Sequence, residues 1–301
     1  MNIKTDKRTL TGYLCAVGCE IFFGFSYLFT KQATNRATAF ALLGWRFCLA
    51  FFVMGLCAFV GIVRINLKGK PLRPLLTAAL FCPVIYFVCE TGGISHTTVS
   101  ESGVFLASIP IACLLASALI LREKPKKLQV VGVLITFTGV IVTVLAAGTE
   151  TSFSAVGYAM LTIAVISYAL YSVSVEKARI YADAEITFVT IASGAVVFGC
   201  LAVIEAASNG NLNELLHLPL TDGAFRMSML YQGIGCSILA FFMWNAAVSR
   251  IGVTRAASFV GVATLVSIIS GVTLLRENFS LIRILGTALI ITGVYTANIK
   301  K

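Results

Sequence analysis

The stretch from Leu128 to Ala146, which reads LQVVGVLITFTGVIVTVLA, contains no charged residue. As a helix rising about 1.5 Å per residue, it is long enough to cross most of the ~30 Å hydrocarbon core of a bilayer. Similar runs recur down the 301-residue chain, of which 58% is hydrophobic and 12% is charged. Since a soluble domain carries about 25% charged residues, the composition predicts an integral membrane protein.

Ten such runs are present, and each is predicted to be a helix because the bilayer core offers no water to satisfy an open backbone. The first begins near the N-terminus. It is long, carries Glu20 and lacks a small-residue cleavage site, so we interpret it as a helix and not as a signal peptide. The predicted spans are 10–30, 38–62, 74–92, 98–121, 128–146, 154–175, 185–205, 226–248, 256–275 and 281–299.

Part of the chain is repeated, because residues 94–140 align with residues 248–294 at a constant offset and without a gap. Both copies contain the tripeptides Leu-Arg-Glu and Thr-Gly-Val at matching positions. The matched residues are Leu121–Glu123 with Leu275–Glu277, Gly132 with Gly286, and Thr138–Val140 with Thr292–Val294. Composition alone does not produce identical tripeptides at one offset across two helices, so we infer two related halves.

We therefore predict an all-α integral membrane fold of ten transmembrane helices. Residues 1–147 form the first five-helix repeat and residues 154–301 form the second. Because five is an odd number, the second repeat enters the membrane in the opposite sense to the first. Many secondary transporters use such inverted-topology repeats to reach two pseudo-symmetric states around a site at the membrane midplane.

The net charge of +10 is distributed unevenly along the chain. With the N-terminus in the cytoplasm, 17 of the 23 Lys and Arg residues fall in inner segments and 5 in outer segments, while Arg46 lies within a span. This bias is the positive-inside pattern of membrane proteins. It predicts a multi-pass protein of the cell membrane with both termini in the cytoplasm, and it explains the positive charge without nucleic-acid binding.

Several short motifs resemble those of one transporter family. They are FFGFS at Phe22–Ser26, WRF at Trp45–Phe47, and SIPI at Ser108–Ile111 in a span that ends in LRE. Together with the five-plus-five arrangement, they resemble the drug/metabolite transporter superfamily, and within it the EamA-type permeases. The resemblance implies transport of small metabolites, since the superfamily includes exporters of amino acids as well as sugar-nucleotide and drug carriers. Thr264 departs from the pattern, because the second copy usually has a proline there.

Two charged residues are predicted to lie near the membrane midplane, where a charge is costly and usually functional. Glu20 is about ten residues into the first span and Arg46 about nine residues into the second, so a pair between them is predicted. Glu20, Gly24, Tyr27 and Lys31 share one helix face, which we expect to line a central cavity. Either Glu20 binds a substrate amine or a proton, or it neutralises Arg46 and locks the two helices together.

Aromatic and amide side chains on other spans complete the predicted substrate site, because pockets for small organic molecules are mostly apolar with a few placed polar groups. Beside Glu20, Tyr27 and Arg46, the candidates are Phe23, Tyr86, Tyr168, Tyr171, Gln232, Trp244 and Asn245. Aromatic residues of membrane proteins mostly pack or form interfacial belts, which is the competing interpretation for each. Pro110 is predicted to kink the fourth span near its middle and to act as a hinge.

Small residues on the fifth and tenth spans are predicted to allow close helix approach. They are Gly132 and Gly139 with their counterparts Gly286 and Gly293. The approach is either between the two repeats or between two copies of the chain, so a homodimer stays open. The nine cysteines all lie within or beside apolar spans, and we interpret them as small packing residues.

The leading functional prediction is secondary transport of a small organic metabolite, such as an amino acid, by alternating access, with export favoured. The expected partners are this small-molecule substrate and the membrane lipids. Import or sugar-nucleotide exchange is the second interpretation, although an anionic nucleotide requires several basic residues where only Arg46 and Lys31 qualify. A membrane enzyme acting on lipid-borne substrates is the third. The sequence contains no recognisable Walker motif, metal cluster or catalytic triad, so we expect no enzyme activity, cofactor or metal.

Overall fold

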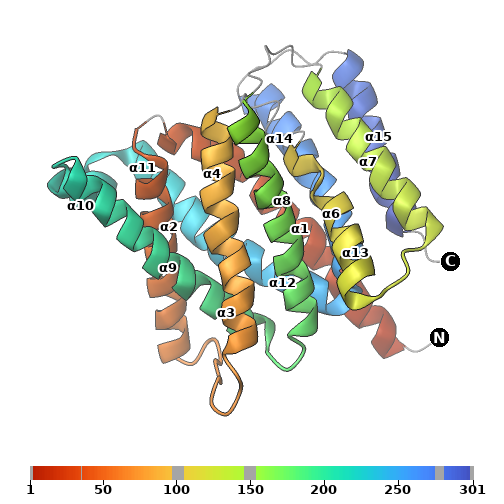
Figure 1. Ribbon diagram of the computed structural model, residues 1–301, viewed down its shortest axis with the longest axis horizontal. Coiled ribbons are helices and arrows are strands. Elements are labelled where there is room, and N and C mark those ends of the chain that lie inside the picture. Colours follow the sequence, from red (N-terminus) through yellow and green to blue (C-terminus); the bar gives the residue numbers. More distant parts are fainter. Residues whose placement is uncertain (1–2, 35, 97–104, 146–153, 275–280, 299–301) are drawn as a thin grey trace.

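The computed structural model describes residues 3–34, 36–96, 105–145, 154–274 and 281–298. Within these ranges the chain forms helices and no strand, and the helices stand side by side in one bundle (Figure 1). The first half contains α1 (Ile3–Thr34), α2 (Ala39–Phe59), α3 (Arg73–Ala79), η1 (Leu80–Ile85), α4 (Tyr86–His96), α6 (Ile109–Ala116), η2 (Ser117–Leu121) and α7 (Lys127–Leu145). The elements η1 and η2 are π-helical turns that continue α3 and α6.

The second half contains helices of similar length in a similar order. They are α8 (Ala155–Lys177), α9 (Asp183–Ser208), α10 (Leu212–Thr221), α11 (Gly223–Leu230), the π-helical η3 (Tyr231–Ala240), α12 (Phe241–Ile251), α13 (Val253–Ala257), α14 (Val260–Leu274) and α15 (Leu281–Asn298). Side-chain caps start helices in both halves of the chain. Thr38 accepts a hydrogen bond from the Ala41 amide at 3.1 Å, and Ser154 accepts one from the Gly157 amide at 3.2 Å, which satisfies amides that have no partner within the helix.

Among the described residues, six helical segments are long and apolar enough to cross a membrane. They are Lys7–Ser26, Ala39–Phe59, Arg73–Gly93, Ala155–Lys177, Asp183–Ser208 and Gly223–Ile251. Four shorter apolar helices lie in the remaining predicted spans, namely Phe105–Leu121, Lys127–Val142, Val253–Val266 and Ile284–Asn298. Each span predicted from the sequence therefore contains a helix, and the chain is a multi-pass membrane protein.

One detail differs from the sequence-based prediction. Residues 209–222, which lie between the predicted spans 185–205 and 226–248, contain the helix α10 at one edge of the bundle, beside the end of α9 (Figure 1). Pro110 stands in the first turn of α6, just after a break in the fourth span at Ser108, where a missing backbone N–H leaves no hydrogen bond unmade. The break agrees with the predicted kink, and the role of Pro110 as a hinge stays a prediction.

The two halves pack against each other in matching pairs. The second long helix of each half contacts the other, as α2 packs on α9, and the last helices pair in the same way, as α7 packs on α15. The first helix of each half lies against two helices of the other half: α1 contacts α12 and α14, and α8 contacts α4 and α6. Helices far apart in the sequence therefore form the centre of the bundle.

The pair of α7 and α15 confirms that the glycines of these spans allow close approach. A Cβ atom on Gly132 would lie 2.6 Å from the Gly293 carbonyl oxygen, and one on Gly139 would lie 2.8 Å from that of Gly286. Both distances are shorter than atoms can tolerate, so the two backbones touch because these positions carry no side chain. Within the chain, this interface joins one half to the other.

Candidate functional site

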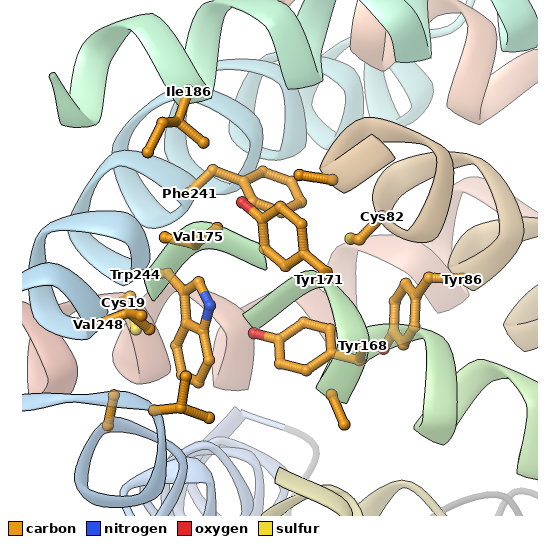
Figure 2. Packing of buried hydrophobic residues seen from close by; sticks show 14 of the residues in the cluster. Cys19, Cys82, Tyr86, Tyr168, Tyr171, Val175, Ile186, Phe241, Trp244 and Val248 are labelled. Carbon is orange, nitrogen blue, oxygen red and sulfur yellow. The ribbon is translucent and has the colours of Figure 1, made fainter. Parts of the chain in front are cut away.

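A cluster of buried aromatic side chains lies at the centre of the bundle, where α1, α4, α8 and α12 meet (Figure 2). The ring centroid of Tyr168 on α8 lies 5.3 Å from that of Tyr86 on α4 and 5.2 Å from that of Trp244 on α12. Tyr171 and Phe241 extend the cluster, with centroids 6.3 Å apart. Such rings offer apolar and π-electron faces to an organic molecule or a cation.

Glu20 is buried beside this cluster, with only 2% of its surface exposed. Its carboxylate is close enough to interact electrostatically with the Tyr168 hydroxyl and with the Cys113 thiol on α6. Its Oε1 accepts a hydrogen bond from the Cys19 thiol at 3.7 Å, and a thiol is a weak donor. A carboxylate in such surroundings is stabilised by few polar groups, so it is suited to bind a cation or a proton.

The predicted pair between Glu20 and Arg46 is wrong. The structure describes both side chains, and no ion pair joins them. Arg46 instead donates hydrogen bonds to Ser237 Oγ at 2.7 Å and to Gln232 Oε1 at 3.0 Å, both on η3. The cause is packing, because Arg46 is directed from α2 toward η3, and α1, which carries Glu20, makes few contacts with α2.

Arg46 is held by several further contacts. Its guanidinium carbon lies 4.9 Å from the centroid of the Phe87 ring and 5.3 Å from that of Phe47, which are favourable cation–π distances. Gln232 in turn donates to Thr30 Oγ1 at 3.1 Å. Arg46 and Gln232 therefore connect α1, α2, α4 and η3, and this arrangement fits the structural role of Arg46 better than a role in binding an anion.

Glu90 on α4 is a deep carboxylate that the sequence analysis missed. It lies within Coulombic range of Arg46 and accepts a hydrogen bond from the Tyr86 hydroxyl at 2.8 Å. Its position only two residues before the predicted end of the third span concealed it. The helix continues to His96, so Glu90 lies deeper than that prediction placed it.

Tyr171 and Asn245 form a hydrogen-bonded chain across three helices. The Tyr171 hydroxyl donates to Asn245 Oδ1 at 2.7 Å, and Asn245 Nδ2 donates to Thr187 Oγ1 at 3.0 Å. All three side chains are fully buried. Their polar atoms therefore satisfy one another and hold α8, α12 and α9 together, next to the cluster that contains Tyr168.

The helix face that carries Glu20, which was predicted to line a cavity, packs against a neighbouring helix at Gly24. Gly24 packs against α14, where a Cβ atom would lie 2.6 Å from Val266 Cβ and 2.7 Å from the Ala263 carbonyl oxygen. The side chains of Tyr27 and Lys31 lie outside the described part of the chain. Phe23 packs edge-on against Phe241, with centroids 6.1 Å apart, and so borders the aromatic cluster.

Three mostly buried carboxylates gather where α8 turns into α9. Glu176 accepts a hydrogen bond from the Val253 amide at 2.7 Å, which starts α13. Asp183 accepts from Arg250 on α12 at 2.7 Å and forms an ion pair with it. Glu185 is 3% exposed and accepts hydrogen bonds from the loop between α2 and α3. We call these three carboxylates and their partners the corner latch.

The contacts of Glu185 give the corner latch its reach into the first half of the chain. Lys70 donates to Glu185 Oε2 at 2.6 Å, and the Asn66 amide donates to Oε1 at 3.0 Å. The Tyr181 hydroxyl also donates to the Pro71 carbonyl oxygen. The corner latch therefore joins the α2–α3 loop of the first half to the ends of α12 and α13 in the second.

Comparison with known families identifies the chain. The model of the EamA-like transporter family matches residues 10–145 and again residues 155–299. The chain belongs to this family. Members of the EamA-like family are transporters and not enzymes, so the predictions of family and of transport, and the absence of enzyme activity, are confirmed.

Individual relatives agree with the EamA-like assignment. The chain is 28% identical to the uncharacterized transporter YcxC of Bacillus subtilis (strain 168) over 289 residues, covering 95% of this chain and 92% of the relative. It is 24% identical to an uncharacterized transporter of Archaeoglobus fulgidus, covering 91% and 94% of the two chains. A solved crystal structure aligns with a TM-score of 0.79 and 19% identity over 96% of this chain and 98% of the other, which shows the shared fold.

Proposed function

We propose that this EamA-like protein is a secondary transporter that exports a small amine-bearing metabolite, such as an amino acid, by alternating access. The observation that carries the proposal is the buried Glu20 carboxylate beside the rings of Tyr86, Tyr168 and Trp244. A carboxylate with few polar neighbours attracts an ammonium group, and aromatic faces add cation–π attraction and apolar contact. Tyr171, Asn245 and Gln232 support this site by fixing the helices around it.

Ten membrane-spanning helices in two inverted repeats, residues 1–147 and 154–301, are part of the proposal. The matching helix pairs support it, because α2 with α9 and α7 with α15 join equivalent helices of the two halves. The contacts of α1 with α12 and α14 likewise correspond to those of α8 with α4 and α6. A two-fold axis in the membrane plane relates helices in this way. When the two repeats swap their conformations, a site between them opens to one side of the membrane and then to the other, which is alternating access.

The corner latch supports a closed cytoplasmic side in this conformation. It lies on the side that the positive-inside pattern assigns to the cytoplasm. Its hydrogen bonds and ion pairs join the α2–α3 loop, α12 and α13 to the turn between α8 and α9. Opening toward the cytoplasm then requires some of these bonds to break. A single partly buried ion pair contributes about 1 kcal/mol or more, so breaking one changes the balance of open and closed states about fivefold.

Replacing Asp183 with asparagine is expected to open the cytoplasmic side more often. The change keeps the size of the side chain and removes its ion pair with Arg250. Cys15 on α1 is partly buried, and it is close enough to Asp183 and Arg250 to interact with their charges. In a variant that retains only this cysteine, the rate of alkylation by a maleimide should rise about fivefold. Glu214→Gln on the exposed part of α10 is the control and should leave the rate unchanged.

The same cysteine tests the orientation of the chain. A membrane-impermeant maleimide should label Cys15 of the Asp183→Asn variant in inside-out vesicles and not in intact cells. Equal labelling rates in Asp183→Asn and Glu214→Gln would contradict the latch, and faster labelling from outside the cell would contradict the proposed orientation with both termini in the cytoplasm.

The transport function itself is tested with purified protein in liposomes. The vesicles are loaded with radiolabelled amino acids, amines or sugar nucleotides, and exchange with external ligand is followed over time. We expect saturable exchange of an amine-bearing compound that empty liposomes do not show. Exchange of sugar nucleotides alone would instead favour the second interpretation, although the hydrogen-bonded and ring-covered Arg46 argues against an anion at that position.

A further inference from the structure

The indole N–H of Trp244 is a buried donor that its surroundings leave unused. Trp244 is 0% exposed, and no described residue accepts a hydrogen bond from its Nε1. Buried donors in native proteins nearly always have a partner, so an exception calls for an explanation. The chain contains one other tryptophan, Trp45, whose Nε1 donates to the Leu215 carbonyl oxygen at 3.0 Å.

The unused donor lies within the candidate site. The Trp244 ring packs on that of Tyr168 at 5.2 Å, and Tyr168 lies within Coulombic range of Glu20. In Figure 2 the indole nitrogen faces the side where Tyr168 and Tyr171 stand, and Cys19, which precedes Glu20 in α1, lies beside the same ring. A negatively charged acceptor, the Glu20 carboxylate, and a free donor, the Trp244 indole N–H, therefore lie beside the same set of aromatic rings.

We propose that the Trp244 indole donates a hydrogen bond to an oxygen of the transported molecule while the Glu20 carboxylate binds its ammonium group. This inference rests on the proposed function and narrows its substrate class. The site selects a primary amine that carries a carbonyl oxygen close to the nitrogen, as in an amino acid or its amide. A simple amine lacks that oxygen and leaves the buried donor unpaired, and a site built around a hydrogen bond discriminates strongly against such an analogue.

Matched pairs of compounds test this selectivity in liposomes. Alaninamide, leucinamide and phenylalaninamide differ from ethylamine, 3-methylbutylamine and 2-phenylethylamine only by the carboxamide group, and the three sizes allow for an unknown side-chain preference. We expect the KM of the amide to be about tenfold lower than that of the amine in the preferred pair. Trp244→Phe keeps an aromatic ring without the N–H, and it should reduce this ratio to about twofold or less.

Fluorescence tests the same bond without relying on the Trp244→Phe variant. In Trp45→Phe, Trp244 is the only tryptophan, and its emission should shift to longer wavelength when the amide of the preferred pair binds and less when the amine binds. The role of Trp244 would be overturned, and the proposed function left standing, by either of two results. One is an unchanged ratio of KM values in Trp244→Phe, and the other is a Trp244 emission wavelength that stays the same when the amide binds. Failure of the wild-type protein to transport any of the six compounds would overturn both.

Discussion

Replacing Glu20 with glutamine is expected to lower transport in liposomes at least about tenfold, because a hydrogen-bonded charge pair with a substrate ammonium contributes about 1.5–3 kcal/mol. Glutamine keeps the shape of the side chain and removes its charge. The substitution therefore separates a role in binding from a role in packing. Transport is measured as initial exchange of the best substrate at equal amounts of reconstituted protein.

The same substitution is expected to leave folding intact. No described basic residue forms an ion pair with Glu20, and the hydrogen bond from the Cys19 thiol is weak. Removing the charge thus leaves no strong partner unsatisfied, and it relieves the cost of burying a carboxylate among apolar groups. Expression and elution as a single species in detergent should match the wild-type protein.

Arg46→Gln provides the contrast, because Arg46 is tied to Gln232, Ser237 and two aromatic rings. Its loss leaves buried polar groups without partners, and we expect poor expression or aggregation. Full transport by Glu20→Gln would end the proposal that this carboxylate serves transport. Loss of expression in Glu20→Gln would show instead that Glu20 is mainly structural.

The sequence predicted the helices well because the thickness of the bilayer sets their length locally. Each long apolar run must span the same hydrocarbon layer as a helix, whatever it packs against. The predicted span 38–62 thus corresponds to α2 at Ala39–Phe59, and 154–175 to α8 at Ala155–Lys177. The glycine contacts of α7 and α15 were predictable for a similar reason, since small residues permit close approach wherever two helices meet.

The contacts of individual polar residues were less predictable, because depth in the membrane does not give direction around the helix. Glu20 and Arg46 lie at similar calculated depths on consecutive helices, yet α1 and α2 make few contacts and α2 packs mainly on α9. Which helices become neighbours depends on the whole bundle. Arg46 bonds to Gln232 and Ser237, which lie 186 and 191 residues away in the sequence, and no local sequence pattern predicts these contacts.

The corner latch and α10 show a further limit of sequence patterns. Glu176, Asp183 and Glu185 stand at the ends of apolar spans, where charged residues are ordinary, so nothing marks them as buried. The helix α10 contains Pro219 and several polar residues, which are typical of a loop. It is nevertheless anchored to the bundle, because the Leu215 carbonyl accepts a hydrogen bond from Trp45 and Leu218 packs near Leu42 and Phe225.

Replacing Gly132 with alanine is expected to destabilise the protein, because the added methyl group meets the backbone of α15. The new Cβ would lie 2.6 Å from the Gly293 carbonyl oxygen and 2.7 Å from Ala297 Cα. These are backbone atoms, which cannot move aside like the end of a side chain, so α7 and α15 must separate. Overpacking of this kind costs about 1–3 kcal/mol.

The measurement is the apparent melting temperature of the purified protein in detergent, which should fall by roughly 2–10 °C. Gly55→Ala is the matched control, since Gly55 also lies within a helix, α2, and a Cβ there meets no atom within 4 Å. Alanine is the better helix former by about 1 kcal/mol, so Gly55→Ala should melt at the wild-type temperature or above. If Gly132→Ala melted at the same temperature as Gly55→Ala, the two backbones would not be in contact, and the joining of the two halves through α7 and α15 would have to be abandoned.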